Sequence, residues 1–454
     1  MKISVFARFV LGICAGAAMI AGCSLGSPNV QGPLPYMQSG NALRALNATG
    51  AGKITHIVYI VQENRSFNNL FYGYPGAYTV TEGKDSKNRT IKLKPSKLGA
   101  YYDIDHSVAA MIAACNGTGK LPGTDCQMNG FNKEWSDANF PHSQYVYVPH
   151  DQSRPYFDMA HEGALADRMF QSQLDESFVA HQYIIAAQAA WSADLPDGYW
   201  GCEDHESAEV AKISKLRVVG GYQKACFDYE TLGDQLDKAN LSWRFYASQY
   251  GSGSSGNGGT WSGYQAIKHI YKHHDWKYVI SPNWKFITDV RNGYLANFTW
   301  ITPVCDDSDH TNCPDDYGPS WVAALVNTVG KSKFWNSTAI VIQWDDWGGL
   351  YDPVAPEYKD RDSLGFRVPL IMLSPYVKHD YVSHTHYETA SVLRFAEDLY
   401  GLHQMAPADR RAISPADSFD FSQKPAKFVP IKAPYPPKFF MHQFPDDYFA
   451  PDYE

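Results

Sequence analysis

The sequence predicts an α/β protein whose central sheet is mostly parallel, with helices layered on both of its faces. Residues 54–61 (ITHIVYIV) and residues 339–342 (AIVI) are apolar and rich in β-branched side chains, which is typical of buried strands. Both segments stop abruptly at polar residues, and stretches with helical periodicity lie between them in the chain. Open α/β sheets place their ligands at the carboxyl ends of their strands, so these polar residues are the first candidates for a functional site.

The N-terminus has the pattern of an export signal. Basic residues precede an apolar run over residues 9–20, and IAGC at residues 20–23 matches a lipoprotein cleavage box. We therefore expect residues 1–22 to be a signal peptide and Cys23 to be a lipid-modified first mature residue. Cleavage nearby as an ordinary signal peptide is the alternative. Ser24 stands where a retention signal would carry Asp, which favours the outer membrane.

Composition divides the rest of the chain into three parts. Residues 23–52 are rich in Gly, Pro, Asn and Ser and are expected to form a flexible tether. Residues 53–402 are expected to form one large domain, and residues 403–454, rich in Pro and aromatic side chains, an extension packed on it. The glycine-rich residues 251–259 have the composition of a mobile loop. The formal net charge of −9 leaves no basic surface of the kind that binds nucleic acid.

The cysteines are expected to form disulfides, as in an oxidising compartment. Without Cys14 in the signal and Cys23 at the anchor, six of the eight cysteines remain. Pairing of neighbours is the simplest arrangement because each bond then closes a short loop, although the number of cysteines leaves other pairings open. The neighbour pairs are Cys115–Cys126, Cys202–Cys226 and Cys305–Cys313. A zinc cluster is the rival, but the chain has no Cys-x-x-Cys.

The first strand is followed by residues 63–67 (ENRSF) and then by Gly73. An acid, an amide and a guanidinium in a row also occur in solvated polar turns. The longer string resembles the opening motif of the bacterial phosphoesterase family, which groups non-specific phospholipases C with certain acid phosphatases within the alkaline-phosphatase superfamily. The resemblance implies an alkaline-phosphatase-like fold, and it implies that Glu63 and Asn64 bind an active-site metal.

The second strand ends in Asp345 and Asp346, followed by WGG. Adjacent carboxylates repel each other, and a loop that concentrates them usually holds a cation. The segment resembles the family's third motif, which implies that the two acids complete the site of one divalent ion. Oxygen ligands favour Mg²⁺, Ca²⁺ or Mn²⁺, with Zn²⁺ still open. The family usually continues Asp-His-Val, whereas here Pro353 follows Asp352, so that histidine is missing.

Ser177 precedes a run with helical spacing and is predicted at the helix N-cap. Capping is the ordinary role of a serine there. A helix N-terminus also offers N–H groups and a positive dipole end, which favour an alkoxide and a bound phosphate. Residues 177–188 (SFVAHQYIIAAQ) resemble the nucleophile segment of acid-phosphatase-like members, which implies that Ser177 is the nucleophile. Phospholipase C members instead carry Thr followed by x-Pro-Asn-Arg, so this chain departs from the lipid-cleaving pattern.

Three histidines complete the candidate site: His106, before a short helical run, His310, in Ser-Asp-His after a strand, and His384, before a helix. Each lies in a segment that resembles a motif of the family. The resemblance implies that they contact phosphoryl oxygens, protonate the leaving group or activate water. A lone histidine is more often structural, and the acidic loop around His310 also has the composition of a solvated turn or a weak calcium site. A Cys305–Cys313 bond would pin the loop that holds His310.

These features together imply an exported, metal-dependent phosphoester hydrolase of the acid-phosphatase type that forms a phosphoserine at Ser177. Its substrate would be a phosphorylated small molecule or a phospholipid, and Cys23 would attach it to a membrane. A phospholipase C that cleaves phosphatidylcholine-like lipids is the first alternative. A non-catalytic surface lipoprotein that binds metal or another ligand on a degenerate scaffold is the second.

Overall fold

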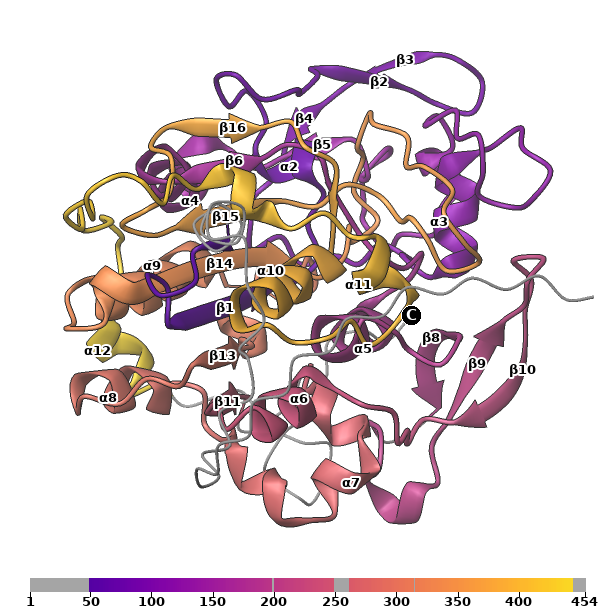
Figure 1. Ribbon diagram of the computed structural model, residues 1–454. Helices are drawn as coiled ribbons and strands as arrows, with labels where there is room; N and C mark the ends of the chain where they lie inside the picture. The colour runs from indigo at the N-terminus through magenta and orange to yellow at the C-terminus, as the bar shows by residue number, and fades with distance from the viewer. Residues whose placement is uncertain (1–48, 198–199, 249–260, 314, 444–454) are drawn as a thin grey trace, which may run out of the picture. The chain divides into compact units, whose positions relative to one another are not determined.

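The computed structural model describes residues 49–197, 200–248, 261–313 and 315–443 (Figure 1). The predicted signal peptide, Cys23, most of the predicted tether and the glycine-rich residues 251–259 lie outside these ranges. Among the described residues, no helix is long and apolar enough to cross a membrane.

The core of the fold is an eight-stranded sheet with the strand order β12-β11-β13-β1-β14-β15-β6-β16. All neighbouring strands pair in parallel except at β15, which is antiparallel to both β14 and β6. The strands are β1 (His56–Gln62), β6 (Ala164–Ala166), β11 (Trp243–Tyr246), β12 (Val279–Ile280), β13 (Phe298–Ile301), β14 (Thr338–Trp344), β15 (Leu370–Leu373) and β16 (Tyr381–Ser383). The predicted mostly parallel sheet is confirmed.

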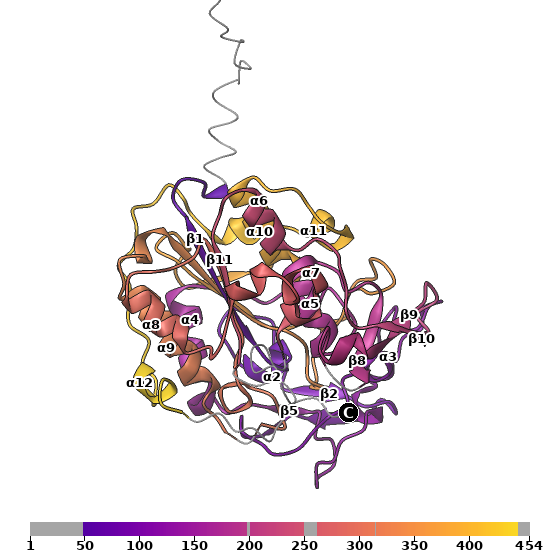
Figure 2. The same cartoon turned by 90° about the horizontal axis from the view of Figure 1, so that it is seen from below.

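Helices cover both faces of this sheet, as Figure 2 shows. One face carries α4 (His150–Glu162), α8 (Lys285–Arg291), α9 (Gly318–Gly330) and α12 (Pro437–Phe440). The opposite face carries α5 (Ser177–Ala186), α6 (Leu232–Lys238), α7 (Lys268–Tyr271), α10 (Ala390–Tyr400) and α11 (Pro407–Arg411). Both surfaces of the central strands are therefore buried, which is why their sequences are continuously apolar rather than alternating.

Smaller elements surround the main sheet. Strands β8 (Ser192–Asp197), β9 (Glu209–Ile213) and β10 (Val219–Lys224) form an antiparallel sheet beside α5. Two-stranded pairs are formed by β2 (Glu82–Lys84) with β3 (Thr90–Lys92), β4 (Lys94–Pro95) with β5 (Val146–Tyr147), and β7 (Met169–Phe170) with β17 (Tyr387–Glu388). Two short helices, α2 (Phe67–Leu70) and α3 (Val108–Cys115), follow β1 and His106 in the chain. They belong to the loops at the carboxyl end of the sheet.

The three neighbour pairs of cysteines form disulfides, as predicted: Cys115–Cys126, Cys202–Cys226 and Cys305–Cys313. Each bond closes a loop outside the main sheet. The last of them encloses η5 (Cys305–Asp307) and the loop that carries His310.

The central pair of strands decides where the site forms. β1 and β14 pair in parallel over their full lengths, from His56 opposite Thr338 to Gln62 opposite Trp344. Because the two strands end in register, the residues that follow them emerge side by side at the same edge of the sheet. This register brings the ENRSF segment next to the acidic pair.

Candidate active site

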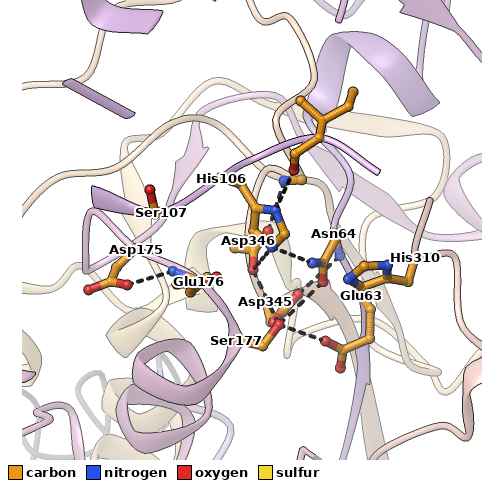
Figure 3. Close-up of polar contacts among 12 residues, drawn as sticks. Glu63, Asn64, His106, Ser107, Asp175, Glu176, Ser177, His310, Asp345 and Asp346 are labelled. Atoms are coloured by element: carbon orange, nitrogen blue, oxygen red, sulfur yellow. Dashed lines mark hydrogen bonds and ion pairs between the residues drawn. The ribbon is translucent and has the colours of Figure 1, made fainter. Parts of the chain in front are cut away.

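Glu63 and Asn64 follow β1, and Asp345 and Asp346 follow β14, so the sheet register places all four side chains together (Figure 3). All four residues are fully buried. The backbone N–H of Asn64 donates a hydrogen bond to Asp345 Oδ1 at 3.1 Å, which ties the two strand ends to each other. The structure therefore brings together the four residues that the sequence predicts as metal ligands.

The backbone at this junction depends on two unusual residues. Asn64 has φ of 55°, a left-handed conformation that asparagine tolerates better than most residues. Gly348, two residues after the acidic pair, also has positive φ, and a Cβ there would lie 2.2 Å from the Asn64 carbonyl oxygen. A side chain at residue 348 would thus push the two strand-end loops apart.

Ser177 is the first residue of α5, and Glu176 occupies the N-cap. The predicted N-cap position of Ser177 is therefore wrong by one residue, a shift that is common at helix ends. Its side chain caps nothing; instead Oγ lies 3.4 Å from Glu63 Oε2, 3.5 Å from Asn64 Oδ1 and 3.4 Å from Asp346 Oδ2. The first turn of α5 directs its backbone N–H groups and positive dipole end toward the same place.

The spacing of these oxygens fits a divalent cation better than it fits hydrogen bonds. Distances of 3.4–3.5 Å are long for O–H···O bonds, whose usual length is about 2.7–2.8 Å. Oxygens that share an octahedral ion with bonds of about 2.1–2.5 Å lie roughly 3.0–3.5 Å apart. Carboxylate, amide and hydroxyl oxygens are also the donors that hard cations prefer. The residues present therefore fit the metal that the resemblance implies.

The Asn64 amide has two possible orientations. In one, its oxygen faces two carboxylates that can only accept. In the other, its nitrogen donates to Asp345 Oδ1 at 3.1 Å and Glu63 Oε2 at 3.2 Å, and its oxygen accepts from Nε2 of His106 and of His310, each at 2.9 Å. An amide oxygen turned toward two carboxylate oxygens is favourable only when a cation lies among them. In this orientation Asn64 Nδ2 lies 2.9 Å from His106 Nε2, so the outer side of the amide contacts a histidine.

The electrostatics of the site also favour a cation. Burial, together with the neighbouring Glu63 carboxylate, raises the pKa of Asp345 well above its usual range. The physical cause is that ionised carboxylates in a dry site lose hydration and repel one another. A divalent ion bound between them would offset both effects.

His106 and His310 lie on the outer side of Asn64. His106 Nδ1 lies 2.8 Å from the Ile104 carbonyl oxygen, to which it can donate, so its Nε2 is the atom that points toward Asn64 and Asp346. The rings of His106 and His310 have centroids 5.9 Å apart and meet edge to face. Both residues are buried, and Figure 3 shows both rings beside Asn64.

The structure does not bring His384 to this group. Its ring is 62% exposed, and Nδ1 pairs with Asp167 Oδ1 at 2.9 Å. His384 follows β16, which is three strands from β14 in the sheet, or about 14 Å at the usual strand spacing. The role of His384 in the site therefore stays a prediction, which this position does not support.

Pro353 follows Asp352 at the position where the family usually has a histidine. In this chain both oxygens of Asp352 contact Arg367 Nε at 3.1 and 3.2 Å, and Oδ2 contacts Nη2 at 3.0 Å. Both side chains are fully buried. Asp352 thus belongs to a structural ion pair. Because Arg367 already pairs with the Asp352 carboxylate, a polar side chain at residue 353 is not needed for that purpose.

Sequence reasoning missed His181. This residue lies four positions after Ser177 on α5, so both side chains project from the same face of the helix. Its Nε2 lies 3.0 Å from Glu63 Oε1 and 3.6 Å from Asp345 Oδ2. The i, i+4 spacing of Ser177 and His181 was the signal available in the sequence.

Comparison with known proteins identifies the family of the chain. The model of the Phosphoesterase family matches residues 54–403, so the chain belongs to that family. Among curated relatives, the non-hemolytic phospholipase C of Burkholderia pseudomallei is 22% identical and covers 86% of this chain, which spans 60% of that relative. Phospholipase C B of Mycobacterium tuberculosis is 24% identical, and the match covers 77% of this chain and 74% of that relative. Non-specific phospholipase C1 of Arabidopsis thaliana is 23% identical, and the match covers 84% of this chain and 74% of that relative.

Similar solved structures include a protein of the alkaline phosphatase superfamily from Vibrio parahaemolyticus. Its TM-score is 0.35 at 9% identity, with 86% of this chain and 79% of that chain covered. A phosphonate monoester hydrolase from Silicibacter pomeroyi has a TM-score of 0.33 at 10% identity, with 61% and 73% covered. Structural similarity at this level adds nothing to the family assignment, which rests on the sequence match.

Proposed function

We propose that this protein is a metal-dependent phosphoester hydrolase that acts through a phosphoseryl intermediate on Ser177. The observation that carries the proposal is the position of Ser177 Oγ, which lies 3.4–3.5 Å from oxygens of Glu63, Asn64 and Asp346. A non-catalytic protein would not need a serine hydroxyl among the oxygens of a metal site. Membership of the Phosphoesterase family supports the same reading.

Glu63, Asn64, Asp345 and Asp346 would hold the divalent metal. Once bound there, the metal would lower the pKa of the serine hydroxyl and neutralise charge that builds up on the phosphoryl oxygens. The all-oxygen donor set favours Mg²⁺, Ca²⁺ or Mn²⁺ over softer ions, although Zn²⁺ also accepts carboxylate ligands.

In the first step Ser177 Oγ attacks phosphorus, so an Oγ–P bond forms and the bond from phosphorus to the leaving oxygen breaks. The serine proton passes to Glu63 Oε2 or Asp346 Oδ2, each 3.4 Å from Oγ. The leaving oxygen then takes up that proton from the carboxylate, because His106 Nε2, which faces Asn64 Nδ2, is placed to accept a proton. The N–H groups at the start of α5 stabilise the phosphoryl oxygens.

In the second step a water molecule attacks the phosphoserine. An O–P bond forms, the Oγ–P bond breaks, and Ser177 regains its proton. His106 Nε2 accepts the proton that the water loses and passes it to Ser177 Oγ, which restores the starting state. The net reaction converts an ester and one water into phosphate and an alcohol.

For the substrate, we propose a phosphoric monoester first. Ser177 and Phe178 stand where phospholipase C members carry Thr followed by x-Pro-Asn-Arg, so the residues around the nucleophile match the phosphatase pattern. Cleavage of a phospholipid is the second candidate, because the relatives that match most of this chain are named phospholipases C. The three disulfides support the further proposal that the protein is exported. The IAGC sequence at residues 20–23 is the reason for proposing Cys23 as its lipid anchor.

The test is hydrolysis of p-nitrophenyl phosphate by the detergent-solubilised full-length protein and its Ser177→Ala variant, each with and without EDTA. We expect chelator-sensitive activity in the wild type and none in the variant. Thr231→Ala, which removes the N-cap hydroxyl of α6 outside the site, is the matched control and should lower stability by about 1 kcal/mol without lowering activity. A folded Ser177→Ala variant with full activity would contradict the proposal.

A panel of substrates separates the alternatives. Phosphatidylcholine vesicles and bis(p-nitrophenyl) phosphate are assayed beside the monoester at equal phosphorus concentration. Preference for the lipid by more than tenfold in kcat/KM would make the protein a phospholipase C. Failure to cleave any of the three substrates after divalent metals are added back would favour the alternative that the protein is a non-catalytic binding lipoprotein.

A further inference from the structure

His181 occupies a defined place in the site that the proposed mechanism does not use. It is the fifth residue of α5, one helical turn beyond Ser177, and it is buried. Its Nε2 lies 3.0 Å from Glu63 Oε1 and 3.6 Å from Asp345 Oδ2. These are two of the four residues that would hold the metal next to Ser177.

Glu63 and Asp345 each direct their two oxygens to opposite sides. Glu63 Oε2 lies near Ser177 Oγ, whereas Glu63 Oε1 lies near His181. Asp345 Oδ1 accepts from the Asn64 backbone, whereas Asp345 Oδ2 makes no hydrogen bond among the described residues and lies 3.6 Å from His181 Nε2. The two carboxylates therefore separate two donor sets and take part in both.

The second donor set has the dimensions of a metal site. Ligands bound at about 2.0–2.2 Å to a tetrahedral or octahedral ion lie roughly 2.8–3.6 Å apart. The two distances from His181 Nε2, 3.0 and 3.6 Å, fall within that range. One ligand atom from each of Glu63, His181 and Asp345 also lies within 4.8 Å of the other two. Three protein ligands leave a position for water, as in many catalytic metal sites.

We propose that Glu63, His181 and Asp345 form a second divalent-cation site that shares its two carboxylates with the site at Ser177. The inference rests on the proposed function, because it assumes that the first site holds a metal. Two ions bridged by shared carboxylates would lie about 3.5–4 Å apart. The two sites differ in chemistry: the first offers only oxygens, whereas the imidazole nitrogen of the second suits Zn²⁺ better than Mg²⁺ or Ca²⁺.

The competing explanation is that His181 Nε2–H only donates a hydrogen bond to Glu63 and orients that carboxylate. Binding stoichiometry distinguishes the two explanations. A positioning hydrogen bond leaves one metal per chain in the wild type. A second site gives two metals per chain, one of which depends on His181.

The experiment uses the full-length protein, stripped of metal with EDTA and titrated with Mn²⁺ alone. Calorimetry counts the bound ions, and electron paramagnetic resonance reports whether they are close enough to couple. We expect two Mn²⁺ per chain and an exchange-coupled spectrum. His181→Gln, which keeps an N–H donor for Glu63 but removes the imidazole ligand, should bind one Mn²⁺ with an uncoupled spectrum. His274→Gln removes an exposed histidine and should behave as the wild type.

Each outcome has one meaning. One uncoupled Mn²⁺ per wild-type chain overturns the second site and leaves the proposed function standing. No bound Mn²⁺ in the wild type contradicts the metal site of the proposed function itself. Two coupled ions in a folded His181→Gln variant overturn the assignment of His181. The number of Mn²⁺ ions bound per wild-type chain decides whether the second site exists, even when the variant does not fold.

Discussion

The disulfide between Cys305 and Cys313 should matter more for catalysis than for stability. It encloses the segment that carries His310, whose backbone N–H donates to Ser308 Oγ at 3.2 Å within the same loop. Replacing both cysteines by serine removes the covalent closure but leaves these hydrogen bonds in place. The loop would then sample more conformations, and His310 would spend less time beside Asn64.

The loss of stability follows from the length of the closed loop. With a sequence separation of 8, the chain-entropy relation gives about 2.6 kcal/mol for Cys305–Cys313. The same relation gives about 3.5 kcal/mol for Cys202–Cys226, whose separation is 24. At ~2.1 cal/mol/K per residue over Leu43–Glu454, these values correspond to melting temperatures lower by about 3 and 4 °C. The loop closed by Cys202 and Cys226 contains none of the predicted site residues, so this second pair is a matched control.

The assay compares kcat for p-nitrophenyl phosphate in both double-serine variants, at a temperature well below the lower melting point. We expect the Cys305/Cys313 variant to lose about 10- to 100-fold in kcat, because displacing a side chain of an active site by about 1 Å has effects of that size. The Cys202/Cys226 variant should keep nearly full activity despite its larger loss of stability. Equal losses of kcat in the two variants, or full activity without the Cys305–Cys313 bond, would refute the reasoning.

Two further predictions concern ion pairs. Asp352→Asn leaves the buried guanidinium of Arg367 without its carboxylate, and should lower the free energy of unfolding by about 3–5 kcal/mol, measured by denaturant titration; a loss below about 1 kcal/mol would contradict a structural ion pair. His269 lies between Asp234 and Asp228, which raise its pKa to about 9 from 6.5. Because the folded-state pKa is the higher one, the stabilisation is complete below pH 6.5 and is lost as the pH rises through about 9. The difference in free energy of unfolding between wild type and His269→Gln should therefore be largest below pH 6.5 and should shrink as the pH rises through about 9. A constant difference from pH 6 to pH 10 would show that the ion pairs do not contribute to stability.

Much of the fold and half of the site could be predicted from local patterns. A run of β-branched residues specifies a buried strand through its own composition, and β1 and β14 form where such runs occur. The polar residues at the end of each run need no long-range information to be noticed, and the resemblance of both segments to family motifs implied that Glu63, Asn64, Asp345 and Asp346 share one metal site. The disulfides were predicted for a similar reason, because neighbouring cysteines close short loops at low entropic cost.

The remaining features depend on contacts between distant parts of the chain. The reversed direction of β15 follows from how its connections cross the sheet, and the strand's own residues carry no sign of it. His384 matches a family segment, yet sheet order puts it three strands from β14, and no local pattern records sheet order.

By itself, therefore, the sequence determined the class of fold, the two polar strand ends and the serine at the start of a helix, and it favoured disulfides between neighbouring cysteines while leaving other pairings open. Only the tertiary structure decided that His181 lies against Glu63 and Asp345 while His384 remains at the surface. The physical reason is that composition and periodicity act over a few residues, whereas a site is assembled by strand register and helix packing over hundreds. A histidine becomes part of it only when those long-range contacts place its ring within about 3 Å of another residue of the site.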